Sequence, residues 1–478
     1  MVARRRRTVP EASDREAASK GDLTPPTPLP LQPLSGVVPR LGVVLAAGRS
    51  ERLRAVTGGG SKALVRLGGL TLVERAVRTL LDAGIEKVLV VVGYHAGPVG
   101  TVVSRLGHGR VHAVLADGWE LGNGSSLAAA EDSVRGHDLF LLVTADHLFG
   151  EGALDRLVRA GEPAVLVDPD PSSEAWAEGC RVRIRGRMAV AFGRQIDEPT
   201  IDCGAFLLSP EVFEAQREAA AEGDHTLAGA VSRLAACRGL RPVPIDDRTW
   251  WQDIDTPEDL RVARSRQRRS LIRDGDGPVS RYLNRPVSTR LSLALAPLRI
   301  SPDLVSLVSV VLALVGAWML ATGRGILGGI VVQVASVLDG VDGETARLLM
   351  RAGPWGAMLD GVLDRVGDAA VMGGLGAWAL GGGSNISPGV VVWLTVAATA
   401  GSLLSMASKD RATALGLPAR PERRLGYLLG GRDGRLLFVA VASIYGRPAA
   451  ALIAVTVTSA ISLALRLWLI RRSVSTTR

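Results

Sequence analysis

The distribution of apolar positions divides the chain into two parts. From Met1 to about Arg273, short aliphatic runs alternate with polar stretches, as in a water-soluble protein. From about Ser301 to Ile470, apolar runs near membrane-spanning length follow one another. Six spans are predicted, near residues 301–321, 325–350, 356–380, 387–408, 435–446 and 449–470. The 478 residues are thus predicted to form a soluble part and an all-α membrane part.

The soluble part alternates strand-like and helix-like segments. Strand-like runs occur at 41–46, 87–95, 138–149 and 164–170, and helix-like stretches lie between them near 70–83, 125–134 and 153–160. This alternation predicts an α/β domain with a mostly parallel sheet. Ligands of such sheets bind beyond the carboxyl ends of the strands, where Gly48, Asp146 and the segment 121–130 are expected.

Basic residues suggest how the chain lies in the membrane. The loop between 381 and 389 has no charge, whereas basic residues gather before the first span, after the fourth and after the last. Both termini and the soluble domain are therefore expected to be cytoplasmic. The net charge of +9 is attributed to these flanks, and nucleic-acid binding is disfavoured because no aromatic-studded basic groove accompanies the arginines.

The N-terminal 38 residues, with four consecutive arginines and a proline-rich stretch, are predicted to be disordered. They do not resemble a secretory signal, because no apolar stretch follows the arginines.

The first strand leads into a turn of small residues at Ala47 and Gly48, where backbone N–H groups can approach phosphates. Arg52 and Lys62 are candidates to neutralise a triphosphate, although an ordinary strand-to-loop turn would have a similar pattern. Asp146 ends an aliphatic strand, so it either caps the next turn or offers a carboxylate to Mg²⁺.

Five motifs, "LAAGRSERL", "GNGSS", "VTADH", "WWQDIDTPEDL" and a lysine after the first of them, resemble the nucleotidyltransferases that make activated sugars and alcohols. The resemblance implies a Rossmann-like sheet in domain 39–264, with Mg²⁺ held by Asp146 and Asp253. Asp255 is expected to share this role, because it follows Asp253 by two residues, and side chains two residues apart in a strand point to the same face of the sheet. It implies nucleotide contacts from Ala46, Ala47, Gly48, Lys62, Asn123 and Ser125, and phosphate contacts from Arg52 and Lys62. Ser61 stands where the family usually has proline.

The segment 201–213 resembles the part of these enzymes that shapes the acceptor pocket, and it would equally suit a strand leading to a turn.

Four acids lie in the most apolar part of the chain. An ionised aspartate deep in a span costs roughly 2.5–3.5 kcal/mol, so the acids need compensation. Asp339 and Asp342 are one helical turn apart, as are Asp360 and Asp364, so two acidic helix faces can converge on divalent cations. Incidental acids in a solvated loop are the alternative, which the apolar flanks disfavour.

The spacing of these acids and of the glycines between them matches the signature of CDP-alcohol phosphotransferases. The resemblance implies a two-metal centre for Mg²⁺ or Mn²⁺, with Asp339, Asp342 and Asp360 as ligands. Asp364 would border the metals and act as base. Gly343, Ala346 and Gly356 would leave room for cytidine, and Arg347 would hold the diphosphate.

Both signatures in this order resemble bifunctional inositol-1-phosphate cytidylyltransferase/di-myo-inositol phosphate phosphate synthases. Residues 276–292 also resemble the juxtamembrane segment of these enzymes. The resemblance implies CDP-inositol formation from CTP and inositol 1-phosphate. It further implies inositol phosphate transfer to a second inositol 1-phosphate, giving a compatible-solute precursor. It also implies a basic linker with an amphipathic helix at 265–298, a membrane domain at 299–478, contact with membrane lipid, and a homodimer through the membrane domain.

The acceptor phosphate needs cations at the membrane face. Candidates are Lys409, Arg411, Arg424, Arg432 and Arg435, each of which would serve equally as an ordinary cytoplasmic loop charge.

Two alternatives remain open. The same chemistry could use a lipid or another phosphorylated alcohol as acceptor. A six-span transporter regulated by a nucleotide-binding domain is the second alternative, which the position of the acids near cytoplasmic span ends disfavours.

Overall fold

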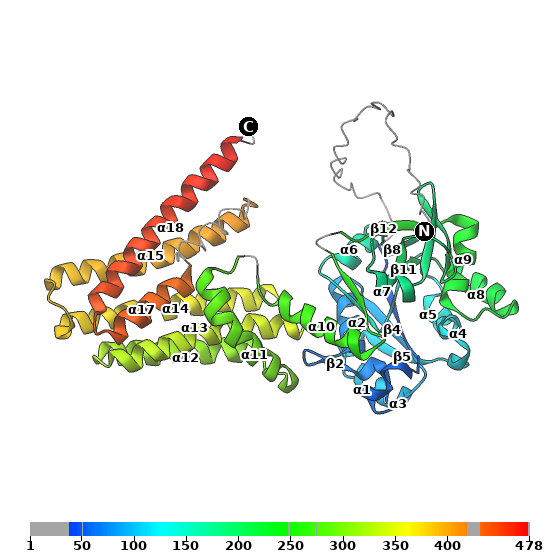
Figure 1. The fold of residues 1–478 in the computed structure, drawn as a ribbon, viewed down its shortest axis with the longest axis horizontal. Coiled ribbons are helices and arrows are strands. Elements are labelled where there is room, and N and C mark those ends of the chain that lie inside the picture. Colours follow the sequence, from blue (N-terminus) through cyan, green and yellow to red (C-terminus); the bar gives the residue numbers. More distant parts are fainter. Residues whose placement is uncertain (1–37, 50, 247–248, 274, 418–430, 477–478) are drawn as a thin grey trace, which may run out of the picture.

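The computed structural model describes residues 38–49, 51–246, 249–273, 275–417 and 431–476. The predicted disordered segment, except for residue 38, and the candidate Arg424 lie outside the described residues. An α/β domain and a helical domain lie end to end, with the helices α2 (Leu72–Asp82) and α10 (Pro257–Ser270) near their junction (Figure 1). The domain boundary predicted after residue 264 falls within α10.

The main sheet of the α/β domain contains nine strands within the described residues. Its centre is parallel, in the order β6 (Phe140–Thr144), β1 (Leu41–Ala46), β4 (Lys87–Val92), β5 (Val111–Leu115). Beyond β6, β11 (Ile201–Leu208) runs antiparallel to β6, β8 and β9. The prediction of a parallel sheet therefore holds for the central strands, and the sheet as a whole is mixed. Its other strands are β8 (Ala164–Asp168), β9 (Arg181–Arg185), β10 (Met188–Gly193) and β12 (Arg241–Pro244).

Both faces of this sheet are covered. Alternation along β1 puts Val43 in one hydrophobic cluster and Val44 in another, because successive side chains of a strand point to opposite faces. The first cluster includes Phe213 of α8, and the second includes Val77 of α2. The remaining helices are α1 (Arg54–Thr57), α3 (Ala96–Val103), α4 (Asn123–Ala128), α5 (Glu131–Val134), α6 (Ala153–Val158), α7 (Ser173–Glu178), α8 (Val212–Ala221) and α9 (Leu227–Arg238).

Two short two-stranded sheets lie outside the main one. The strands β2 (Arg66–Leu67) and β3 (Leu70–Thr71) form a hairpin that leads into α2. The strands β7 (His147–Phe149) and β13 (Trp251–Asp253) pair antiparallel. The single strand predicted at 138–149 is therefore divided into β6 and β7, with Asp146 between them.

The helical domain begins with a juxtamembrane helix, α11 (Arg285–Leu295), and continues as a bundle. Among the described residues, four helices are long and apolar enough to cross a membrane: α12 (Pro302–Ala321), α13 (Gly325–Leu348), α15 (Pro388–Ala414) and α18 (Pro448–Thr476). The helices α14 (Pro354–Trp378) and α17 (Arg432–Ile444) occupy the third and fifth predicted spans. They do not meet the same criterion, because α14 carries Asp360, Asp364, Arg365 and Asp368, and α17 has 13 residues.

Candidate active sites

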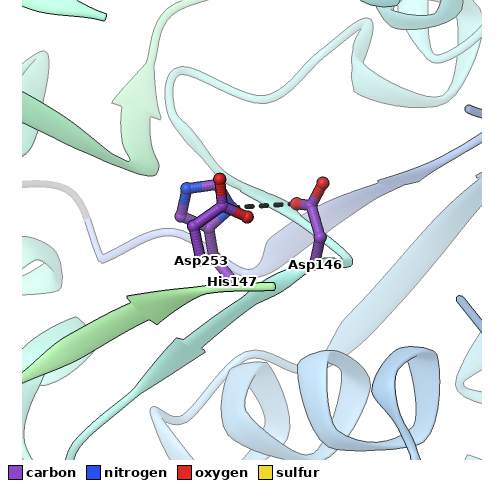
Figure 2. A group of neighbouring side chains, drawn as sticks. All are labelled: Asp146, His147 and Asp253. Carbon is purple, nitrogen blue, oxygen red and sulfur yellow. Dashed lines mark hydrogen bonds and ion pairs between the residues drawn. The ribbon is translucent and has the colours of Figure 1, made fainter. Parts of the chain in front are cut away.

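Strand pairing assembles an acidic cluster in the α/β domain. In the β7–β13 ladder His147 is the partner of Asp253, and Asp146 directly precedes β7. Asp146, His147 and Asp253 each offer a ligand atom within 4.8 Å of the others. Figure 2 shows the carboxylate of Asp146 directed toward the imidazole of His147. The two predicted metal ligands are thus brought together, and carboxylates are ligands that Mg²⁺ prefers.

Sequence reasoning assigned no role to His147, which lies within this cluster. Its Nδ1 lies 2.9 Å from Oδ1 of Asp146 and 2.6 Å from Oγ1 of Thr144. Burial alone would lower the pKa of His147, but the carboxylates of Asp253 and Asp146 outweigh burial and raise this pKa to about 9. The indole of Trp251 stacks on the imidazole at 5.5 Å and 11°. Only the "VTADH" motif itself pointed to this histidine.

The pKa values of the other charged groups in this cluster are shifted in different directions. Burial raises the pKa of Asp253 to about 6, although His147 opposes the shift. For Asp146, burial acts in the same direction, but the nearby Lys62 and His147 dominate and hold its pKa well below the ordinary value. Lys62 Nζ lies 2.6 Å from Oδ2 of Asp146 and also pairs with Asp255. Burial lowers the pKa of Lys62, but the three aspartates reverse this shift and raise it above its ordinary value.

Ser61 performs a local task that proline could not. Its hydroxyl accepts a hydrogen bond from the N–H of Ala63 at 3.3 Å and caps the short turn Lys62–Leu64. The serine therefore stabilises the turn that presents Lys62 to the acids.

The predicted strand position of Asp255 is wrong. The strand β13 ends at Asp253, and the backbone N–H of Asp255 donates to Asp259 at 3.1 Å, in the turn before α10. Asp255 is not among the three clustered ligand groups but pairs with Lys62 and lies 3.6 Å from Arg52. Arg52 also pairs with Glu178 of α7 at 2.7 Å. Lys62 and Arg52, the predicted phosphate contacts, are therefore joined through one carboxylate.

The other predicted nucleotide contacts lie near the carboxyl edge of the sheet or on α4. Ala46 ends β1, the carbonyl of Ala47 accepts from the N–H of Tyr94, and Gly48 is exposed. Asn123 begins α4, and its side-chain oxygen accepts from the N–H of Leu227 at 2.8 Å. Ser125 lies 3.4 Å from His225.

The segment 201–213 contains β11 and the start of α8, and it also approaches the acidic cluster. Gly204 has a φ of +69°, and a Cβ added there would lie 2.7 Å from the ring of His147. Glycine is therefore required for β11 to pass this close to the site.

A second acidic cluster lies in the helical domain. Asp339 of α13 and Asp360 and Asp364 of α14 each place a carboxylate oxygen within 4.8 Å of the others. Residues 360 and 364 are one turn apart and therefore share a helix face. The cluster lines a cavity together with Ser306 and Ser309 of α12. The convergence of two acidic helix faces, as predicted from spacing, is present in the structure.

Asp342 lies next to this cluster but outside its closest three members. It is 5% exposed, and it accepts a hydrogen bond from the hydroxyl of Ser306. Asp342 and Asp360 are near enough to interact electrostatically.

Arg432 of α17 reaches into the same cluster. Its guanidinium lies 2.6 Å from Asp339, 2.9 Å from Asp364 and 2.9 Å from Asp368. Asp368 is also bound by the hydroxyl of Ser402 at 2.9 Å. Arg432 was predicted to contact an acceptor phosphate, and in the structure its partners are carboxylates.

The other described candidates for that phosphate differ in environment. Lys409 and Arg411 are exposed near the end of α15, and Arg435 is 3% exposed within α17.

The predicted cytidine and diphosphate contacts lie near the C-terminal end of α13 and the N-terminal end of α14. Gly343, Ala346 and Gly356 are half-buried, and the nearest atom to a Cβ built on Gly356 is Oδ1 of Asp303 at 4.0 Å. Arg347 donates from Nη2 to the carbonyl of Leu271 at 3.1 Å.

Comparison with known proteins covers both domains. Residues 42–237 match the family described as MobA-like NTP transferase domain, and residues 299–421 match CDP-alcohol phosphatidyltransferase. A bifunctional IPC transferase and DIPP synthase from Rubrobacter xylanophilus is 37% identical over 86% of this chain and 92% of its own length. A protein of the same name from Thermococcus kodakarensis is 30% identical over 78% of this chain and 83% of its own length. Another, from Aquifex aeolicus, is 30% identical over 84% of this chain and 92% of its own length.

Proposed function

This chain belongs to the family of bifunctional IPC transferases and DIPP synthases, and we propose on that premise that it catalyses two consecutive reactions. The α/β domain makes CDP-inositol from CTP and inositol 1-phosphate. The helical domain transfers inositol phosphate from CDP-inositol to a second inositol 1-phosphate. The observation that supports this proposal best is the presence of two separate acidic clusters, one in each domain, at Asp146 and Asp253 and at Asp339, Asp360 and Asp364.

In the first reaction, the phosphate oxygen of inositol 1-phosphate attacks the α-phosphorus of CTP, and pyrophosphate leaves. Asp146 and Asp253 would hold Mg²⁺, which when bound offsets the charge that develops on the phosphates. Lys62 and Arg52 would contact the triphosphate, and their carboxylate partners keep both side chains directed toward this site. Ala46, Ala47, Gly48, Asn123 and Ser125 are proposed to line the nucleotide.

In the second reaction, an inositol hydroxyl attacks the phosphorus that carries inositol in CDP-inositol. The bond from that phosphorus to the bridging oxygen breaks, and CMP leaves. Asp339, Asp342 and Asp360 would hold Mg²⁺ or Mn²⁺, which when bound neutralises the diphosphate. Asp364 would take the proton of the attacking hydroxyl.

The cytidine would pack against Gly343, Ala346 and Gly356, with Arg347 on the diphosphate. Lys409, Arg411, Arg424 and Arg435 stay candidates for the acceptor phosphate. Arg432 remains one as well, provided that metal ions replace it at the carboxylates.

We further infer that all six helices α12–α15, α17 and α18 cross the membrane. The charged helix α14 packs against both α12 and α15, and the short helix α17 packs against α13 and α18, so each has span-forming neighbours on two sides. The α/β domain, which contacts the last turn of α13, and both termini would be cytoplasmic. A homodimer through the membrane domain, with lipid around it, completes the proposal.

The test uses purified full-length protein with CTP and Mg²⁺ and a panel of phosphorylated alcohols and lipid acceptors. Mass spectrometry should detect CDP-inositol, CMP and the phosphorylated di-inositol product when inositol 1-phosphate is supplied. Release of pyrophosphate only with another alcohol phosphate would reject the proposed substrate. CMP release only with a lipid acceptor would replace the second reaction by phospholipid synthesis.

A further inference from the structure

The last turn of α13 is completed by arginines of the α/β domain. Nη2 of Arg75, on α2, donates to the carbonyl of Leu348 at 2.9 Å, and Nη1 of Arg78 donates to the carbonyl of Leu349 at 2.9 Å. The last four carbonyls of a helix lack partners within the helix, and cations near them are favoured by the helix dipole. One catalytic domain therefore caps a helix that carries the acidic cluster of the other.

Arg75 is itself held in place before it reaches α13. Its Nε and Nη2 donate to the carbonyl of Leu67 in the β2–β3 hairpin at 3.0 and 2.6 Å, and the residue is 9% exposed. The guanidinium thus joins two backbone carbonyls that belong to different domains. A lysine has one nitrogen and could not reproduce this planar arrangement.

The hairpin approaches the helical domain closely enough to require glycine. Gly69 has a φ of +87°, and a Cβ added there would overlap the carbonyl of Ala296, which follows α11. In the first turn of α2, which follows the hairpin, Glu74 pairs with Arg299 at 2.7 Å, and the Glu74 side chain is 3% exposed. These contacts place the hairpin and the start of α2 against the segment that joins α11 to α12.

The capped carbonyl lies beside a proposed substrate contact. Arg347 precedes Leu348, and its Nη2 donates to the carbonyl of Leu271 at the end of α10. The side chains of Leu271, Ala296 and Leu348 form a buried cluster around this position. The end of α13 is therefore held by α2 on one side and by the end of α10 on the other.

We propose that Arg75 is a positioning residue for the membrane reaction, which it serves by fixing the last turn of α13 and hence the guanidinium of Arg347 against the CDP-inositol diphosphate. This inference rests on the proposed function. The metal-binding acids have their own supports higher in the bundle, since Asp339 is bound by Arg432 and Asp342 by Ser306. Loss of the Arg75 cap should therefore weaken binding of the CDP-alcohol more than it slows the chemical step.

The experiment uses full-length protein in detergent with supplied CDP-inositol and inositol 1-phosphate, and measures CMP release. Arg75→Ala should raise the KM for CDP-inositol about tenfold, with kcat within about twofold, since a charged hydrogen bond is lost. Pyrophosphate release from CTP and inositol 1-phosphate should stay within about twofold. Arg75→Lys should recover part of the KM, and Arg66→Ala, which changes an exposed arginine of the same hairpin, should match wild type.

A double variant separates positioning from a general loss of structure. If Arg75 acts through Arg347, then Arg75→Ala combined with Arg347→Ala should raise the KM no more than Arg347→Ala alone. Multiplied effects in the double variant, or an unchanged KM in Arg75→Ala, would overturn the inference. If Arg75→Ala does not fold, Arg78→Ala, which removes the contacts with the carbonyls of Leu349 and Met350 but keeps the Arg75 cap on Leu348, should show a smaller shift of the same sign, and no shift would equally overturn the inference. Absence of CMP release by wild type would instead reject the proposed function.

Discussion

Arg432 lies 2.6 Å from Asp339, and this ion pair joins α17 to α13 inside the membrane-domain cluster. The same guanidinium contacts Asp364 and Asp368. The guanidinium therefore occupies carboxylate oxygens that a divalent cation would also need, so Arg432 and the cation should compete for them. We expect Arg432→Gln to lower the Mg²⁺ concentration that half-saturates CMP release, while the maximal rate falls. A titration of CMP release against Mg²⁺ checks both effects. A higher Mg²⁺ requirement would show that Arg432 supports metal binding instead.

Asp146→Asn should reduce pyrophosphate release from CTP and inositol 1-phosphate at least a hundredfold, because the amide replaces a proposed metal ligand that also pairs with Lys62. CMP release from supplied CDP-inositol should remain at the wild-type rate. A coupled pyrophosphate assay and a CMP assay on the same preparation measure the two reactions. Normal pyrophosphate release would remove Asp146 from the site.

Asp364→Asn should give the opposite pattern. The amide keeps the shape of the carboxylate but cannot accept the proton of the attacking hydroxyl, so CDP-inositol should accumulate from CTP and inositol 1-phosphate with little CMP. Added CDP-inositol should not rescue it, whereas mixing it with the Asp146→Asn variant should restore the di-inositol product. Loss of both half-reactions in each folded variant would require obligatory coupling between the domains.

The Glu74–Arg299 pair should make the domain junction sensitive to acid. Burial raises the pKa of Glu74, but the Thr71 N–H and Arg299 outweigh burial and hold this pKa below its ordinary value of 4.5. A folded-state pKa below the unfolded value stabilises the protein above pH 4.5, and this contribution is lost as the pH falls through the folded-state pKa. Glu74→Gln, which can keep the helix cap, should therefore unfold at a lower temperature than wild type at neutral pH.

This difference in melting temperature should stay constant down to about pH 4.5 and then shrink on further acidification. Thermal unfolding in detergent across this range provides the measurement. A difference that grows in acid would contradict the depressed pKa of Glu74.

A buried carboxylate should anchor the juxtamembrane helix. Glu344 of α13 accepts hydrogen bonds from Arg285 at 2.7 Å, Ser288 at 2.7 Å and Ser292 at 2.6 Å, and its side chain has no exposed area. Glu344→Ala would leave the 12%-exposed Arg285 with Asp276 as its remaining carboxylate partner, and removing one partner of a buried pair costs about 3–5 kcal/mol. We expect a clear fall in melting temperature, smaller for Glu344→Gln, whose one carbonyl oxygen still accepts from one serine while its amide N–H can donate to the hydroxyl of the other. Equal melting temperatures for all three proteins would show that α11 is held by other contacts.

The sequence predicted those features that residue type and spacing express directly. The pairs Asp339/Asp342 and Asp360/Asp364 could be placed on converging helix faces because ionised groups in an apolar segment need compensation, and three of the four cluster. The place of Asp255 was mispredicted, because Thr256 and Asp259 form a capping box that starts α10 and ends the strand early. That Thr-x-x-Asp spacing is visible in the sequence and could have prevented the error.

Other features could not be predicted from a local stretch of sequence, because they depend on contacts between distant parts of the chain. His147 belongs to its cluster through a ladder between strands more than a hundred residues apart, so only tertiary structure could reveal its neighbours. The acceptors of Arg75 are backbone carbonyls, which every residue possesses, and no residue type marks them in advance. The strands β1, β4, β6 and β8 were predictable from their aliphatic runs, whereas β5, β9, β10 and β12 were not predicted and the antiparallel direction of β11 depends on its neighbours.

The cap on α13 has a consequence for exchanging one domain between family members. On the membrane side the acceptors are the carbonyls of Leu348 and Leu349, whereas on the other side they require the arginine side chains of α2. A chimera should therefore tolerate a foreign membrane domain whose second span ends at the same height, with apolar side chains of similar size at these two buried positions. A foreign α/β domain would have to bring arginines at the two α2 positions and glycine in the hairpin turn. The specific side chains of the cap thus belong to the soluble half, whereas the Glu74–Arg299 pair needs one side chain from each half. A redesigned fusion should therefore keep this α/β domain together with Arg299 and exchange the helices that follow.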